Sequence, residues 1–165
     1  DFAAVVGQAQ EKGYTEPDPK IDLSGVDVMR KILILAREAG LELEMSDIQN
    51  NSFLSPEALA THNNQDLYAQ LIKDETKMHQ LWQNAQDHGA KLKYTALLDG
   101  QKARVGIEVI PKDHPFFHLP GSDNIVLLYS ARYPTSPMVI QGAGAGAAVT
   151  ASGIFADIIR ASKQE

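Results

Sequence analysis

Five charged side chains near the start of the chain have the residue types and spacing that acid–base chemistry needs. Glu16, Asp18 and Asp22 belong to a short stretch that also holds two prolines, and Asp27 and Lys31 follow it four residues apart. On a helix, residues at this spacing share one face and lie within contact distance. A lysine beside carboxylates can have its proton affinity tuned for proton transfer. The pattern therefore indicates that several carboxylates and one ammonium group could converge on a small site.

The same spacing is also typical of a structural ion pair. An exposed pair of this kind contributes only about 0.3–0.5 kcal/mol to a helix, and ion pairs without a catalytic role also perturb proton affinities. From the spacing alone, an ion pair is favoured over catalysis. A calcium loop is disfavoured, because prolines interrupt the stretch and its acidic residues lack the alternating spacing of calcium ligands.

The glycine and alanine run at 142–146 is a second candidate site. The run begins the pattern G-x-G-x-x-A, follows an apolar segment and precedes a predicted helix. Glycines permit close approach to the backbone, and a helix N-terminus offers unpaired N–H groups to an anion. A dinucleotide fingerprint needs a further strand with an acidic residue, and this chain has no such strand after the run. The run therefore predicts one edge of a cofactor site, or alternatively a tight strand-to-helix turn.

The elements that must position these residues follow from apolar periodicity. Helical spacing predicts helices over 2–12, 25–39, 65–88 and 149–163. Alternation and apolar runs predict strands over 41–48, 91–98, 103–110, 124–133 and 138–141. Because the strands cluster instead of alternating with helices, we expect an α+β fold with helices packed on one face of a mixed β-sheet.

Local signals refine these elements. Ser24 is the expected N-cap of the 25–39 helix, with Asp27 completing a short capping box. The two prolines make 14–22 a stiff loop without helix. Asp74 marks an expected break in the 65–88 helix, and Asp99 with Gly100 predicts a hairpin turn.

Composition excludes several classes of function. The 165 residues are 44% hydrophobic and 22% charged, which is typical of one globular domain. The net charge of −6 disfavours nucleic acid as a partner. Because cysteine is absent, a disulfide scaffold and a zinc–thiolate site are excluded, and a cytoplasmic location is expected. No apolar stretch reaches the roughly 18 residues of a membrane span, and the scattered histidines predict no metal site.

Two blocks of the sequence resemble a known enzyme family. Gly13-Tyr14-Thr15-Glu16-Pro17-Asp18-Pro19, then Asp22-Leu23-Ser24-Gly25 and Asp27-Val28-x-Arg30-Lys31, is similar to the signature of homoserine dehydrogenases. The tail, Gly142-Ala143-Gly144-Ala145-Gly146 with Val149-Thr150-Ala151, resembles the C-terminal segment of that family. The resemblance extends over essentially the whole chain and is most specific in these two blocks.

The resemblance implies an oxidoreductase that reduces L-aspartate 4-semialdehyde to L-homoserine with NADPH or NADH, in threonine and methionine biosynthesis. Lys31 looks like the proton donor to the carbonyl oxygen, and Asp27 like its partner and a substrate contact. Glu16 resembles the carboxylate that holds the substrate ammonium, with Gly13 and Asp22 nearby. An ammonium substrate needs carboxylates, and a developing alkoxide needs a nearby proton or positive charge.

The resemblance further implies a cofactor contact and a division of the chain. Gly144 and Gly146 look like the glycines that touch the nicotinamide nucleotide. Residues 1–148 would form a substrate domain similar to the C-terminal domain of glyceraldehyde-3-phosphate dehydrogenase. Residues 149–165 would form a helix that packs on a nucleotide-binding domain.

The 165 residues themselves carry no sequence pattern of that nucleotide-binding domain, and they begin within a helical pattern. We therefore expect a fragment, nearly inactive alone, from a homo-oligomeric parent. A bifunctional aspartokinase–homoserine dehydrogenase is favoured as that parent over a short monofunctional enzyme. An exposed apolar face should border the glycine run and the 149–163 helix. The alternative is a non-catalytic binding or oligomerisation module, whose apolar strands could pair across a dimer.

Overall fold

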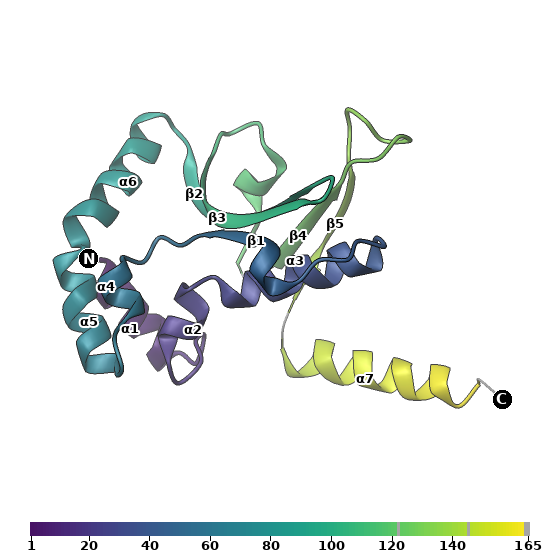
Figure 1. The fold of residues 1–165 in the computed structure, drawn as a ribbon, viewed down its shortest axis with the longest axis horizontal. Coiled ribbons are helices and arrows are strands. Elements are labelled where there is room, and N and C mark those ends of the chain that lie inside the picture. Colours follow the sequence, from purple (N-terminus) through teal and green to yellow (C-terminus); the bar gives the residue numbers. More distant parts are fainter. Residues whose placement is uncertain (122, 145, 164–165) are drawn as a thin grey trace. The chain divides into compact units, whose positions relative to one another are not determined.

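The computed structural model describes residues 1–121, 123–144 and 146–163 (Figure 1). The chain divides into two units, Asp1–Lys112 and Asp113–Glu165, and each has a β-sheet of its own. The predicted α+β class is confirmed, with the strands of the described residues divided between two sheets.

The first unit combines a group of helices with a three-stranded sheet. Its helices are α1 (Phe2–Glu11), α2 (Pro19–Leu23), α3 (Val26–Glu38), α4 (Pro56–Leu59), α5 (Asn64–Lys73) and α6 (Glu75–Asp87), with a 3₁₀ turn, η1, at Met45–Asp47. Its strands are β1 (Ile48–Asn51), β2 (Lys91–Asp99) and β3 (Lys102–Ile110). The strand order is β1-β3-β2, with β1 parallel and β2 antiparallel to β3. The predicted hairpin and the break at Asp74 are both confirmed.

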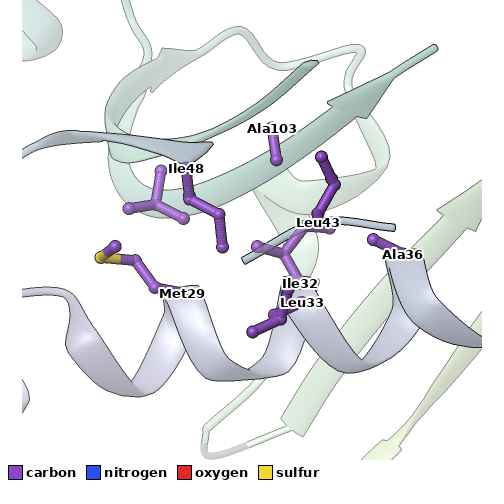
Figure 2. Close-up of a cluster of buried hydrophobic side chains, with 8 residues drawn as sticks. Met29, Ile32, Leu33, Ala36, Leu43, Ile48 and Ala103 are labelled. Carbon is purple, nitrogen blue, oxygen red and sulfur yellow. The ribbon is translucent and has the colours of Figure 1, made fainter. Parts of the chain in front are cut away.

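Helix α3 covers one face of this sheet. Met29, Ile32, Leu33 and Ala36 are buried, and their spacing places them on a single helical stripe. Figure 2 shows this stripe facing the side chains of Leu43, Ile48 and Ala103. A second apolar cluster joins α1, α4 and α5 through Ala3, Val6, Leu54, Ala58, Leu67 and Leu71. Because the buried stripe of α3 packs against the sheet, the opposite, polar face of α3 is free to carry functional groups.

The strand expected over 41–48 is wrong. Met45–Asp47 form the 3₁₀ turn instead, and the strand begins only at Ile48. Glu44 and Asp47 form a reciprocal capping box at this turn, and Arg37 pairs with Glu44 at 2.8 Å while its Nε donates to the Leu43 carbonyl. These local hydrogen bonds compete with a β ladder and therefore override the alternating apolar pattern.

The expectations for the loop at 14–22 and for Ser24 need correction. The end of the loop is helical, because Asp18 caps the Lys20 amide and Pro19 occupies the first helical position. Ser24 ends α2 instead of capping α3. The N-cap of α3 is Gly25, which has a φ of +86°.

The second unit holds a two-stranded antiparallel sheet and a long helix. Its elements are the 3₁₀ turn η2 (Pro115–His118), β4 (Asp123–Leu128), β5 (Met138–Ala143) and α7 (Ala147–Ala161). Strand β4 is shorter than the 124–133 expected, because the backbone of Ser130 and Tyr133 turns through reciprocal hydrogen bonds. Asn124 lies opposite Gly142 in the sheet, which brings β4 beside the glycine run.

Candidate active site

Asp27 and Lys31 form an ion pair on the open face of α3. Lys31 Nζ lies 2.8 Å from Asp27 Oδ2, and the side chains are 56% and 51% exposed. Asp27 occupies the first turn of the helix, where the helix dipole favours a negative charge. Because both side chains are about half exposed, the lysine ammonium is accessible to a ligand, and its carboxylate partner orients it.

The loop that carries Glu16 begins where Gly13 ends α1. Gly13 has a φ of +70°, and the backbone amides of Gly13 and Tyr14 donate back to Gln10 and Ala9 at 2.9 Å. Glycine is suited to this left-handed position because it has no Cβ. Helix α1 therefore ends a few residues before Glu16, and Glu16 lies in the loop that follows.

Asp22 closes the same loop from its other end. Its Oδ2 accepts a hydrogen bond from the Glu16 backbone amide at 2.9 Å. Asp22 lies in α2, and the intervening Pro19 is fully buried. Of the predicted substrate residues, Asp22 thus contacts Glu16 directly and supports its backbone.

Glu16 lines a shallow cleft of about 430 Å³. The cleft is lined by the polar residues Glu16, Lys20, Ser24 and Arg30, and by the apolar Ile21, Val26 and Leu59. Val26 and Arg30 precede Asp27 and Lys31 by one residue, so they lie about 100° around the helix. The structure therefore places Glu16 beside one face of α3 and the Asp27–Lys31 pair on the neighbouring face.

Sequence reasoning did not single out Lys20 or Arg30, the two cations of this cleft. Their signal was present, because Lys20 follows Glu16 by four residues and Arg30 belongs to the quoted signature. Lys20 Nζ donates to the Thr61 carbonyl, which ties α2 to the end of α4. A cleft with one carboxylate and cationic neighbours can bind a zwitterionic ligand.

The glycine run lies in the second unit, and its Ala145 is outside the described residues. A Cβ on Gly144 would lie only 1.5 Å from Asn124 Nδ2, so Asn124 occupies the space of a side chain there. Gly146 is the N-cap of α7 with a φ of +125°, and the described atoms include no side-chain cap for this helix. The first turn of α7 therefore keeps backbone N–H groups available to an anion.

The apolar face expected along the last helix is confirmed. Ile154, Phe155, Ile158 and Ile159 of α7 are all exposed, as is Val149 near its start.

Within the described ranges, no group of three or more His, Cys, Asp or Glu side chains could hold a metal ion. No described helix is long and apolar enough to cross a membrane.

Comparison with known proteins assigns the family. The chain matches the family model described as homoserine dehydrogenase over residues 1–159. It is 47% identical over 165 residues to the bifunctional aspartokinase/homoserine dehydrogenase 1, chloroplastic, of Zea mays, covering 98% of this chain and 18% of that protein. It is 41% identical to the homoserine dehydrogenase of Paracoccidioides brasiliensis, covering 96% of this chain and 44% of that protein.

A solved structure extends the similarity to three dimensions. A crystal structure of a Candida auris protein of unknown function is 37% identical, with a TM-score of 0.90, and the match covers 99% of this chain and 46% of that one. The chain thus spans less than half the length of these relatives. The family match does not favour a non-catalytic module. The family model matches residues 1–159, and the Zea mays relative is 47% identical across nearly the whole chain. The chain therefore belongs to the homoserine dehydrogenase family.

Proposed function

We propose that this chain is the substrate-binding and proton-donating part of an NAD(P)-dependent homoserine dehydrogenase that reduces L-aspartate 4-semialdehyde to L-homoserine. The observation that carries the proposal is the Asp27–Lys31 pair at 2.8 Å, on the open face of a helix whose other face is anchored in the core. The family match supports the same reaction. The parent would act as a homo-oligomer with a small-molecule substrate. A cytoplasmic location stays a prediction, since the Zea mays relative is named as chloroplastic.

Lys31 would supply the proton that completes the reduction. When bound, a reduced nicotinamide cofactor would supply the hydride for the aldehyde carbon, and the carbonyl oxygen would gain the electron pair of its π bond. The Lys31 ammonium gives one proton to this oxygen, which forms the alcohol and leaves a neutral amine to be reprotonated by solvent. Asp27, whose Oδ2 lies 2.8 Å from Lys31 Nζ, holds the lysine in place before transfer.

The residues at the glycine run fit a nucleotide. Gly146 meets no described atom within 4 Å at the position of a Cβ, so a ligand could approach its backbone closely. The N-terminus of α7, uncapped by any described side chain, suits a phosphate group. Gly146 and, from the family resemblance, Gly144 are the proposed cofactor contacts, and the exposed apolar face of α7 would pack on the nucleotide-binding domain.

Glu16 would bind the substrate ammonium, so Glu16→Gln tests the substrate site. This change keeps the shape of the side chain and removes its charge. A hydrogen bond to a charged group contributes about 1.5–3 kcal/mol, so the KM for aspartate semialdehyde should rise by about 10–150-fold. The measurement is steady-state NADPH oxidation by the full-length protein. Glu38→Gln, at the exposed end of α3, is the matched control and should behave like the wild type. Equal KM values for the two variants would contradict the role of Glu16.

Gly144→Ala tests the cofactor contact. The new Cβ would meet the Asn124 amide, and that side chain must then rotate away from the glycine run. Because Asn124 is exposed, the free energy of unfolding should change little, while the KM for NADPH rises by about threefold to tenfold, since a displacement of about 1 Å at a bound group is costly. Gly142→Ala meets no described atom within 4 Å and is the matched control. A Gly144→Ala protein with an unchanged KM for NADPH would remove this glycine from the cofactor site.

A further inference from the structure

Two tyrosines of the first unit reach the backbone of the candidate site through a side-chain amide. In the first arrangement, Tyr68 Oη donates to Gln10 Oε1 at 2.8 Å, and Gln10 Nε2 donates to the Pro17 carbonyl at 3.1 Å. Asn64 Nδ2 donates to the same carbonyl at 2.9 Å. Pro17 directly follows Glu16, so this arrangement holds the backbone that carries the proposed ammonium-binding carboxylate.

The second arrangement repeats the first at the start of α3. Tyr94 Oη donates to Asn50 Oδ1 at 3.2 Å, and Asn50 Nδ2 donates to the Ser24 carbonyl at 2.7 Å. The phenol oxygen also fills the space beside Gly25, since a Cβ there would lie 2.0 Å from it. Asp27 lies only two residues after Gly25, so the contacts with Ser24 and Gly25 position Asp27 and with it the Asp27–Lys31 ion pair.

The protonation of the two tyrosines determines which groups donate and which accept in each arrangement of hydrogen bonds. Burial raises the pKa of Tyr94, and burial together with the nearby Glu11 charge raises the pKa of Tyr68. Both hydroxyls therefore stay protonated at neutral pH and act as donors. Each amide oxygen must then accept from its tyrosine, which turns each amide NH₂ toward the backbone carbonyl.

The ring of Tyr94 is itself held by neighbours. Phe53 packs edge-on against it with ring centroids 5.8 Å apart, and Phe2 packs edge-on against Phe53 at the same distance. These contacts link the helical cluster to the sheet. The phenol of Tyr94 is therefore held in place, and it positions the N-terminus of α3.

We propose that these are two positioning relays for one active site: the Tyr68 relay (Tyr68 and Gln10) places Glu16, and the Tyr94 relay (Tyr94 and Asn50) places the Asp27–Lys31 pair. The inference rests on the function proposed above. If Glu16 binds substrate and Lys31 donates the proton, the relays control different kinetic constants. Loss of the Tyr68 relay weakens substrate binding, and loss of the Tyr94 relay slows chemistry.

The test compares Tyr68→Phe with Tyr94→Phe in the full-length protein, by steady-state NADPH oxidation with aspartate semialdehyde. Each change removes one hydroxyl and keeps the ring. Tyr68→Phe should raise the KM for the semialdehyde by about threefold to tenfold with kcat nearly unchanged, and Tyr94→Phe should lower kcat by a similar factor with KM nearly unchanged. Gln83→Ala, which removes a hydrogen bond from an exposed amide to Asp87 within α6, is the control and should change neither constant.

Double variants separate a relay from a general loss of stability. If Tyr94 acts through Asn50, adding Tyr94→Phe to Asn50→Ala should lower kcat no further, and adding Tyr68→Phe to Gln10→Ala should raise the KM for the semialdehyde no further. Asn50 is exposed, so Asn50→Ala carries the test alone should Tyr94→Phe fail to fold.

Two results would overturn the relays. In the first, both tyrosine variants change the same kinetic constant, either kcat or the KM for the semialdehyde, by the same factor. In the second, both tyrosine variants have the kcat and KM of Gln83→Ala while Lys31→Ala is inactive. The proposed function fails in a different way, because the wild-type protein itself would then not reduce the semialdehyde.

Discussion

Replacing Lys31 with alanine in the full-length protein should lower kcat for the reduction of aspartate semialdehyde by about 10²–10⁴-fold, the usual contribution of a general acid. The physical reason is that the carbonyl oxygen would gain negative charge with no ammonium beside it to supply a proton. Lys31→Arg should be almost as damaging, because a guanidinium keeps the charge next to Asp27 but does not release a proton in proteins. The measurement is kcat at saturating NADPH and semialdehyde.

The same variants should fold normally. Lys31 is 56% exposed, and an exposed helical ion pair contributes only about 0.3–0.5 kcal/mol. Thermal unfolding of Lys31→Ala should therefore be close to that of the wild type. Lys77→Ala, an exposed lysine of α6, is the control for the loss of a surface cation. Full activity in Lys31→Ala would exclude this lysine as the proton donor.

Gly25→Ala is expected to be the most destabilising of the changes considered for α3. The residue has a φ of +86°, which costs about 1–2 kcal/mol for a side chain. The new methyl group would also lie 2.0 Å from Tyr94 Oη and 3.1 Å from Asn50 Oδ1, and overpacking of this kind costs about 1–3 kcal/mol. Together these predict a loss of about 2–5 kcal/mol in the free energy of unfolding, measured by urea denaturation.

A matched glycine separates the two contributions. Gly40 has a φ of +85°, and no described atom lies within 4 Å of its Cβ position. Gly40→Ala should therefore show the backbone cost without the steric clash. Adding Tyr94→Phe to Gly25→Ala should recover part of the stability, since it removes the nearest atom. Equal losses for Gly25→Ala and Gly40→Ala would show that the contact with Tyr94 has no energetic consequence.

Much of the fold was predictable because its signals are local. The stripe of Met29, Ile32, Leu33 and Ala36 has helical spacing, and the Asp99–Gly100 turn lies between two alternating strands. Helix period and turn chemistry depend on residues only a few positions apart. One failure was also local in origin. At 41–48, side-chain hydrogen bonds around Glu44 and Asp47 favoured a 3₁₀ turn over the strand that alternation suggested.

The start of α3 shows where local reasoning stops. Ser24 has the right residue type for an N-cap, yet it ends α2, and its carbonyl accepts a hydrogen bond from Asn50, 26 residues away. Gly25 is required because Tyr94, far along the chain, occupies the space beside it. Neither contact has a sequence signal, because a partner at long range is chosen by the packing of the sheet against the helix.

The sequence by itself determined the family, the candidate residues and the i, i+4 pairing of Asp27 with Lys31, since each depends on residue type and short spacing. The tertiary structure alone decided which candidates share a surface. It joined Asp22 to the Glu16 backbone, put Glu16 in a cleft with Arg30, and tied Pro17 and Ser24 to distant tyrosines through side-chain amides. The physical reason is that hydrogen bonds and steric exclusion act over a few ångströms of space, whatever the separation along the chain.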